Sequence, residues 1–379
     1  MIRRRTLLGA ACATPALIGR AFAADAGVGD NELLIGQSAV LSGPLGVSLQ
    51  GFNAGAKLVF DELNAQGGLH GRKLKLLSLD DELKPERALA NYKALLVEHK
   101  VFAFFGGVGS GTIAAAAPVL KESNAPLIGN FALSDAVREK AKGAAYFVRA
   151  TYGREATKLV QHLGTIGITR IAVAHLDNPG GQEVLALVKA AVLAEGKAKD
   201  VAGAAAVKND GSNAVEAGKA LAATDAQAVV MFIAGPPVAQ LMQAIGEAGA
   251  SPAFYGMSVV AGDQVAKALG PKLRGLATSQ VVPYPWSDAD PTARAFRQQC
   301  EAAKVPVAYH TYEGYVNALV LAEGLRRAGR ALTRSGLHAA MRGLRARIAG
   351  IDIDYTGGDP TGSRFVELVH VGAEGRFRR

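Results

Sequence analysis

The sequence predicts an α/β protein built from two doubly wound, Rossmann-like lobes. Short β-rich apolar runs alternate with helical patterns through most of the chain, and this alternation is typical of parallel sheets made of right-handed βαβ units. The alternation runs twice, from about residue 31 to 146 and again from about 150 to 280. A length of 379 residues exceeds one ordinary domain, which favours two lobes.

The first run begins with a strand-like segment at 33–36. Residues 50–66 then show helical periodicity, and Gly67-Gly68 ends that helix, as glycine commonly does past a helix C-terminus. The alternating residues at 73–80 predict a second strand. The remaining expected elements of this run are helices at about 85–98 and 112–121 and strands at 101–105 and 126–128.

The second run repeats the pattern, and the chain then becomes mainly helical. Its expected strands are 170–174, 228–233 and 253–255, and its expected helices are about 182–195 and 237–248. After residue 290 the periodicity predicts helices at about 290–304, 311–328 and 334–345, followed by a strand-like piece at 365–371. This late helical block does not require a third domain, because it can pack against the earlier lobes.

Residues 1–24 are predicted to be a signal peptide. Arg3-Arg4-Arg5 precedes an apolar stretch from Leu7 to Ile18, and Ala21-Phe22-Ala23 places small residues where signal peptidase cleaves. The apolar stretch is shorter than the roughly twenty residues that span a bilayer. We therefore expect export to the periplasm with cleavage near Ala23. Arg4-Arg5-Thr6-Leu7-Leu8 fits the twin-arginine pattern, and the general secretory route is the alternative.

Charge and cysteine content narrow the class of partner. The chain has a formal charge of +9, but four of its arginines lie in the first 24 residues, which leaves 38 basic against 33 acidic residues. A nucleic-acid-binding protein would need its excess charge gathered on one face, so we expect no nucleic-acid partner. After cleavage Cys300 is the one remaining cysteine, which excludes an intrachain disulfide.

A glycine-rich loop, Gly106 to Thr112, follows a predicted strand and opens a helix. It does not fit the dinucleotide fingerprint, because Thr112 occupies the third glycine position, and it lacks the lysine of a P-loop. Free amides at a helix N-terminus, with the hydroxyls of Ser110 and Thr112, can bind a carboxylate as well as a phosphate. A simple Gly/Ser helix cap is the alternative.

Catalytic and metal-binding patterns are not evident. The seven histidines show no H-x-x-x-H spacing, and no serine lies in a G-x-S-x-G motif. Asp80 and Asp81 are adjacent on a strand and therefore face opposite ways, which argues against a cooperating pair. We expect no metal site and no cofactor, and we expect that the protein is not an enzyme.

Six segments together resemble a known family. They are Leu41–Pro44, Asn64–Arg72, Asp80-Asp81 with Pro85, Gly106–Pro118, Ser279–Pro283 and Tyr312–Tyr315. Their order and spacing are similar to those of the type I periplasmic substrate-binding proteins of ABC transporters, in the branched-chain amino-acid-binding (Leu/Ile/Val) group.

This resemblance implies two lobes joined by a hinge of three crossings, with a ligand held between them. Lobe 1 would comprise residues 25–147 plus 281–345, and lobe 2 would comprise 148–280 plus 346–379. The implied function is that of an extracytoplasmic solute-binding protein of an ABC importer, a monomer that closes on its ligand and docks on an inner-membrane permease. Two alternatives are a periplasmic ligand sensor for a membrane receptor and an exported enzyme, although the latter would need a nucleophile or metal that the sequence does not show.

The resemblance also implies a set of ligand-binding positions. Ser110, with Gly109 and Thr112 beside it, would bind the ligand carboxylate. Further positions are Asn130, Phe131 and Ala132 after the next strand, Ser258 in place of an ammonium-binding Glu, Gly180 and Gly235 in place of two pocket tyrosines, and Ser48 in place of another aromatic. The family's first-lobe disulfide positions hold Leu83 and Gly109 here.

These departures bear on the ligand. A buried ammonium without a paired carboxylate costs several kcal/mol, and Ser258 supplies no charge. The two glycines leave room for a larger group. We therefore hypothesise a carboxylate ligand without an amine, such as an aromatic or short aliphatic acid, while an amino acid paired with some other anion stays open. Phe131 is either a stacking surface for this ligand or an ordinary core residue.

Overall fold

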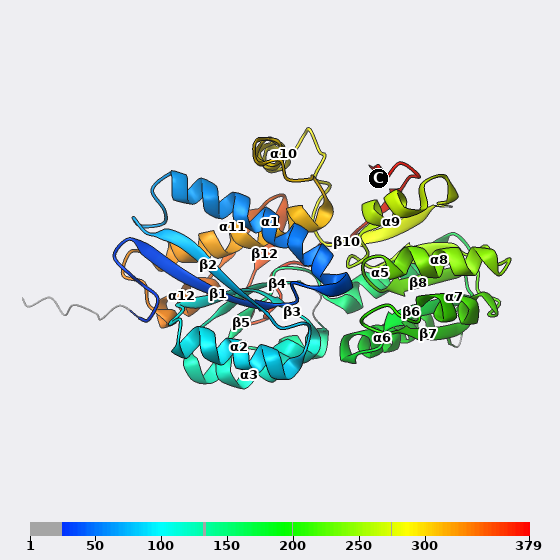
Figure 1. The fold of residues 1–379 in the computed structure, drawn as a ribbon, viewed down its shortest axis with the longest axis horizontal. Coiled ribbons are helices and arrows are strands. Elements are labelled where there is room, and N and C mark those ends of the chain that lie inside the picture. The colour runs from blue at the N-terminus through cyan, green and yellow to red at the C-terminus, as the bar shows by residue number, and fades with distance from the viewer. Residues whose placement is uncertain (1–24, 132–133, 199, 274) are drawn as a thin grey trace, which may run out of the picture.

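The computed structural model describes residues 25–131, 134–198, 200–273 and 275–379, so the predicted signal peptide lies outside the described residues. It contains two large β-sheets, each flanked by helices, and one short two-stranded sheet. The two large sheets lie side by side along the long axis of the molecule (Figure 1). The predicted α/β fold with two mainly parallel sheets is confirmed.

The first sheet has five parallel strands in the order β2-β1-β3-β4-β5. The strands are β1 (Glu32–Ala39), β2 (Lys73–Asp80), β3 (Ala103–Val108), β4 (Leu127–Phe131) and β5 (Ala145–Tyr146). Helices α1 (Gly43–Ala65) and α11 (Tyr309–Ala328) cover one face, and α2 (Pro85–Val97) and α3 (Ser110–Ser123) cover the other (Figure 1). The short helix α4 (Asp135–Lys140) precedes β5, and α12 (Arg334–Arg342) packs on α11.

The second sheet has the order β14-β13-β10-β9-β8-β6-β7. Its parallel strands are β6 (Ile171–Leu176), β7 (Gly203–Val207), β8 (Ala228–Phe232), β9 (Ala253–Gly256) and β10 (Leu276–Gln280), and the antiparallel pair β13 (Glu367–Val371) and β14 (Phe377–Arg378) extends one edge. Helices α5 (Tyr152–Thr165) and α6 (Pro179–Glu195) pack together, as do α7 (Ala214–Ala222) and α8 (Pro237–Glu247). The remaining elements are α9 (Gly262–Leu269), the 3-10 turn η1 (Gly270–Lys272), α10 (Pro291–Ala303) and the hairpin β11 (Arg345–Ile348) with β12 (Ile351–Asp354).

Two of the helix boundaries that differ from the prediction have a clear physical cause. Helix α1 begins at Gly43 rather than near residue 50, because Pro44 is preset for the first helical turn. Helix α12 ends at Arg342 rather than 345, because residues 345–348 pair with 351–354 in a hairpin. The apolar pattern alone could not reveal this competing strand pairing.

Small residues bring α1 and α11 into close contact. A Cβ on Gly55 would lie 1.7 Å from the carbonyl oxygen of Thr311, and a Cβ on Gly314 would lie 1.8 Å from that of Phe52. Both positions therefore need glycine. This close packing fixes α11 on the first sheet although 240 residues or more separate the helices in sequence, and it holds His310 and Glu313 near the junction of the two lobes.

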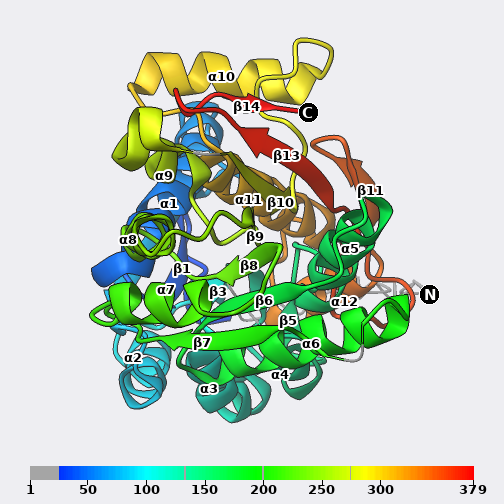
Figure 2. The same cartoon turned by 90° about the vertical axis from the view of Figure 1, so that its right-hand side faces the viewer.

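Two of the chain segments that run between the sheets lie side by side. The backbone N–H of Phe147 donates to the carbonyl of Pro360 at 2.7 Å, and the N–H of Ser363 donates to the carbonyl of Val148 at 3.0 Å. The two segments are thus paired at the junction, while the residue boundaries of the two lobes stay a prediction. Figure 2 views the molecule from the side of the second sheet, with β13 and β14 near α10. Among the described residues no helix combines the length and hydropathy needed to cross a membrane.

Candidate functional site

A pocket of about 280 Å³ lies between the two lobes, where strands of both sheets end. The first lobe contributes the starts of α1 and α3 and the segments after β2 and β3. The second lobe contributes the segments after β6 and β7, the end of β8 and the start of α5. Ligands of open α/β sheets bind at the carboxyl ends of the strands. Its lining residues are Leu45, Leu83, Pro85, Gly109, Ser110, Gly111, Tyr152, Leu176, Asp177, Asn178, Pro179, Gly180, Asn209 and Phe232.

The N-terminus of α3 opens into this pocket. Gly109 is the N-cap residue with φ +81°, a conformation that favours glycine, and it offers no side chain to cap the helix. The first amides of α3 therefore have neither an intrahelical partner nor a side-chain cap. The Ser110 hydroxyl accepts a hydrogen bond from the backbone N–H of Ser134 at 3.0 Å, so its own proton remains available to a ligand.

The second lobe faces this helix at very short range. A Cβ on Gly180, near the start of α6, would lie 2.8 Å from the Ser110 hydroxyl oxygen. A Cβ on Gly235 would lie 2.7 Å from the carbonyl oxygen of Pro44, at the start of α1. The predicted glycines thus lie where the lobes touch, and a side chain at either position would push the lobes apart.

The rest of the pocket is mostly apolar, with a polar end. The rings of Tyr152 and Phe232 pack edge to face with centroids 4.8 Å apart, and Leu83 lies over Gly109, where a Cβ would be 2.6 Å from its side chain. Asn178 donates to the side-chain oxygen of Asn209 at 2.7 Å. The pocket can therefore hold a small molecule with a negatively charged end and an apolar body.

Sequence reasoning did not single out several of these residues. Asp177 is an exposed carboxylate at the rim of the pocket, directly after β6. Its position at the carboxyl end of a predicted parallel strand is a signal that could have identified it. Tyr152 carries no comparable signal, because a tyrosine at the start of a helix has no pattern that distinguishes a pocket residue from a core residue.

Other predicted positions lie away from the pocket lining. The Thr112 hydroxyl donates to the carbonyls of Val108 and Gly109, and the Asn130 side chain accepts from the N–H of Val148 at 3.1 Å. Ser48 is buried within α1. The structure thus brings Gly109, Ser110 and Gly180 together in the pocket. It places Thr112, Asn130 and Ser48 in the framework that supports the pocket, while Ala132 lies outside the described residues.

Phe131 is fully buried and packs as a core residue. Its ring lies 5.7 Å from that of Phe52 and 5.2 Å from that of His310. The guanidinium carbon of Arg149 lies over the Phe131 ring, 5.7 Å from its centroid. Of the two interpretations of Phe131, these contacts support the core residue.

Ser258 belongs to a buried charged cluster rather than to the pocket lining. Its hydroxyl accepts from the guanidinium of Arg149, its N–H donates to Glu155 at 2.8 Å, and its carbonyl contacts His310 Nε2 at 2.9 Å. The Ser279 hydroxyl also donates to Glu155, at 2.6 Å. The position aligned with an ammonium-binding Glu is therefore occupied by contacts within the protein.

In this cluster Arg149 forms ion pairs with two carboxylates. Its guanidinium lies 3.1 Å from Glu155 and 3.3 Å from Glu313. Burial lowers the pKa of Arg149, but the carboxylates of Glu313 and Glu155 together raise it by more. The net shift of the pKa is therefore upward, and the side chain stays charged. Burial raises the pKa of Glu313 to about 7, since Arg149 only partly offsets the desolvation and Glu155 adds repulsion.

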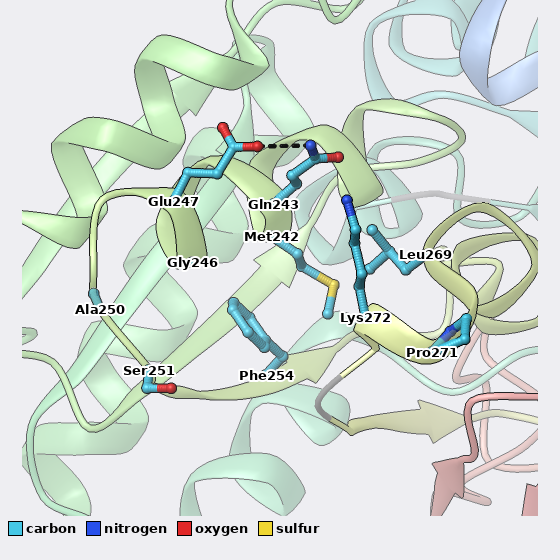
Figure 3. Close-up of a pocket in the computed structure, with 10 residues that line it drawn as sticks. All are labelled: Met242, Gln243, Gly246, Glu247, Ala250, Ser251, Phe254, Leu269, Pro271 and Lys272. Carbon is cyan, nitrogen blue, oxygen red and sulfur yellow. Dashed lines mark hydrogen bonds between the residues drawn. The ribbon is translucent and has the colours of Figure 1, made fainter.

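A second and larger pocket, of about 350 Å³, lies on the outer side of the second lobe. Figure 3 shows it between α8, the start of β9 and the η1 turn, with the Gln243 amide donating to Glu247 at 2.7 Å. It lies beside the amino end of β9, whereas ligands of this type of sheet bind at the carboxyl ends. We therefore assign the candidate site to the pocket between the lobes, where both lobes contribute polar groups.

Comparison with known proteins defines the class. The family model described as "Periplasmic binding protein" matches residues 32–375. With its two sheets and interlobe pocket, the chain belongs to this family of type I periplasmic binding proteins, as the resemblance implied. None of the curated proteins matches it significantly.

Within the described part of the chain, no group of three or more His, Cys, Asp or Glu side chains could hold a metal ion.

Solved structures agree with this assignment. A substrate-binding periplasmic protein from Ralstonia solanacearum is 29% identical with a TM-score of 0.84, and the match covers 91% of this chain and 99% of that one. A possible leucine/isoleucine/valine-binding protein from Rhodopirellula baltica SH 1 is 26% identical with a TM-score of 0.83, covering 92% and 96%. An extracellular ligand-binding receptor from Verminephrobacter eiseniae, at 24% identity, shares the fold with a TM-score of 0.83, covering 92% and 100%.

Proposed function

We propose that this protein is the extracytoplasmic solute-binding component of an ABC importer and that it binds a small organic carboxylate. The observation that carries this proposal is the uncapped N-terminus of α3, with the Ser110 hydroxyl, opening into a pocket between two lobes. Amides at a helix N-terminus attract anions through their hydrogen bonds and through the helix dipole. The protein acts by binding and release.

Hinge closure would couple binding to delivery. The ligand carboxylate docks on the first lobe at Ser110, and the second lobe then closes around the apolar body of the ligand. The short approach of Gly180 to Ser110 supports such a closed arrangement. Ligand shifts the equilibrium toward the closed form because that form alone contacts it from both sides. The closed protein then docks on a permease in the inner membrane, and the chain resides in the periplasm.

The ligand is proposed to lack an ammonium group. Ser258 is engaged by Arg149 and Glu155, so the position that would bind an ammonium in relatives offers no free carboxylate. Asp177 lines the pocket and carries a carboxylate. Because Asp177 is exposed, water can solvate this carboxylate, and it needs no cationic group from the ligand. Leucine or valine would need to pair with Asp177, whereas an aromatic or short aliphatic acid would not.

A thermal-shift screen of the wild type and the Asp177→Asn variant tests this proposal. We expect benzoate, 4-hydroxybenzoate or a short aliphatic acid to raise the unfolding temperature of both proteins. Leucine and valine should have little effect on either. Strong stabilisation by leucine or valine that disappears in Asp177→Asn would show instead that the ligand is an amino acid.

A further inference from the structure

Tyr152 lines the pocket, and its hydroxyl is a buried polar group to which the proposed site gives no role. Tyr152 is fully buried and opens α5 in the second lobe. Its backbone N–H donates to Asp135 at 2.9 Å, and its ring packs against Phe232. The side chain is therefore held in one place on the wall of the pocket.

Its hydroxyl has no hydrogen-bond partner among the residues that the structure describes. Leaving a buried hydroxyl unsatisfied is costly, and native proteins seldom do so without a reason. Burial raises the pKa of Tyr152 above its ordinary value, so the hydroxyl keeps its proton at neutral pH and can donate it in a hydrogen bond. A ligand oxygen in the pocket would supply the missing acceptor.

We propose that Tyr152 is a ligand-binding residue of the second lobe, whose hydroxyl donates a hydrogen bond to an oxygen of the bound acid. Its ring and that of Phe232 form a wall against which the apolar body of the acid packs. This inference rests on the proposed function. It adds a contact from the second lobe to the one that Ser110 makes from the first lobe. Because the acid then contacts both lobes, its binding stabilises the closed form.

Calorimetric titration of the Tyr152→Phe variant tests the inference, with Tyr312→Phe as a matched control. The Tyr312 hydroxyl is also buried without a partner among the described residues, but its ring packs against Phe296 and Tyr315 outside the pocket. The probes are benzoate, 4-hydroxybenzoate and 3-methylbutanoate. Tyr152→Phe should weaken binding of the acids that the wild type binds by about tenfold, the loss of one hydrogen bond, whereas Tyr312→Phe should not.

The ligand-free unfolding temperature separates this role from a structural one. Removing an unsatisfied hydroxyl should leave that temperature unchanged or slightly higher in Tyr152→Phe. A second variant, Phe232→Leu, keeps the hydroxyl and should weaken binding of the two aromatic acids more than that of 3-methylbutanoate. Equal affinity of the wild type and Tyr152→Phe would overturn the inference and leave the proposed function standing. Failure of the wild type to bind any of the three acids would overturn both.

Discussion

The carboxylate of Glu313 lies 3.3 Å from the guanidinium of Arg149, and both side chains are buried. Glu313 belongs to α11 on the first sheet, and Arg149 lies in the segment that leaves that sheet. On its other side the guanidinium contacts Glu155, on α5 of the second lobe. The Arg149 guanidinium therefore forms ion pairs with two carboxylates, one from each lobe.

This arrangement predicts a pH-dependent stability that originates at Glu313. Glu155 receives hydrogen bonds from Ser258 and Ser279, whereas Oε1 of Glu313 has none from the described residues. The pKa of Glu313 is about 7 in the folded protein and about 4.5 in the unfolded chain. Between these values the folded state binds a proton that the unfolded state has lost. Stability from this group is therefore fully present below pH 4.5 and decreases as the pH rises to 7, by roughly 3 kcal/mol.

Urea unfolding of the wild type and Glu313→Gln at pH 5 and pH 7 measures this effect. Other titrating groups cancel in the difference between the two proteins. The free energy of unfolding of the wild type relative to Glu313→Gln should fall between pH 5 and pH 7. A difference that is the same at both values would show that Glu313 does not titrate in this range.

Removing the cation should be much more damaging than removing a surface arginine. Arg149→Met leaves two buried carboxylates without a counter-ion, which should cost about 3–5 kcal/mol of unfolding free energy. Arg345→Met is the control, because Arg345 pairs with Asp354 at 3.5 Å on the surface and should cost less than about 1 kcal/mol. Chemical denaturation at neutral pH compares them. Similar losses in the two variants would contradict the importance assigned to the buried cluster.

A side chain at Gly180 should hinder closure without harming the fold. Its Cβ would lie 2.8 Å from the Ser110 hydroxyl oxygen across the cleft, whereas a Cβ on Gly246, in α8 of the same lobe, meets nothing within 4 Å. Gly180→Val should therefore weaken acid binding by at least about tenfold relative to Gly246→Val, with similar unfolding temperatures for the ligand-free variants. Titration calorimetry measures the affinities, and equal values would mean that the lobes do not meet at this position when ligand binds.

The sequence predicts the fold well because parallel strands and amphipathic helices have strong local signals. The strands at 73–80 and 228–233 and the helices at 290–304 and 311–328 lie within a few residues of the observed elements. Strand β7 and helix α7 have no counterpart among the expected elements. The strand sequence, Gly-Ala-Ala-Ala-Val, carries little β-propensity, and its place in the sheet comes from pairing with β6.

The site was less predictable, because side-chain direction depends on tertiary contacts. The loop at Gly109 and Ser110 was identifiable from its glycines and from its place between a strand and a helix. Phe131 ends β4 and Ser258 follows β9, but both side chains are buried and contact Arg149 instead of lining the pocket. Only the three-dimensional structure brings Arg149, Glu155 and Glu313 together, since the two glutamates are separated by more than 150 residues in sequence.

Calorimetry combined with small-angle scattering on the wild type and the Ser110→Asp variant tests most directly whether a carboxylate binds at the N-terminus of α3. A carboxylate at position 110 would repel an anionic ligand from the amides of α3. We expect the wild type to bind at least one acid of the panel and to become more compact, and we expect Ser110→Asp to show neither change. Identical affinities and identical scattering changes in the two proteins would contradict the claim that the ligand is a carboxylate held at this helix.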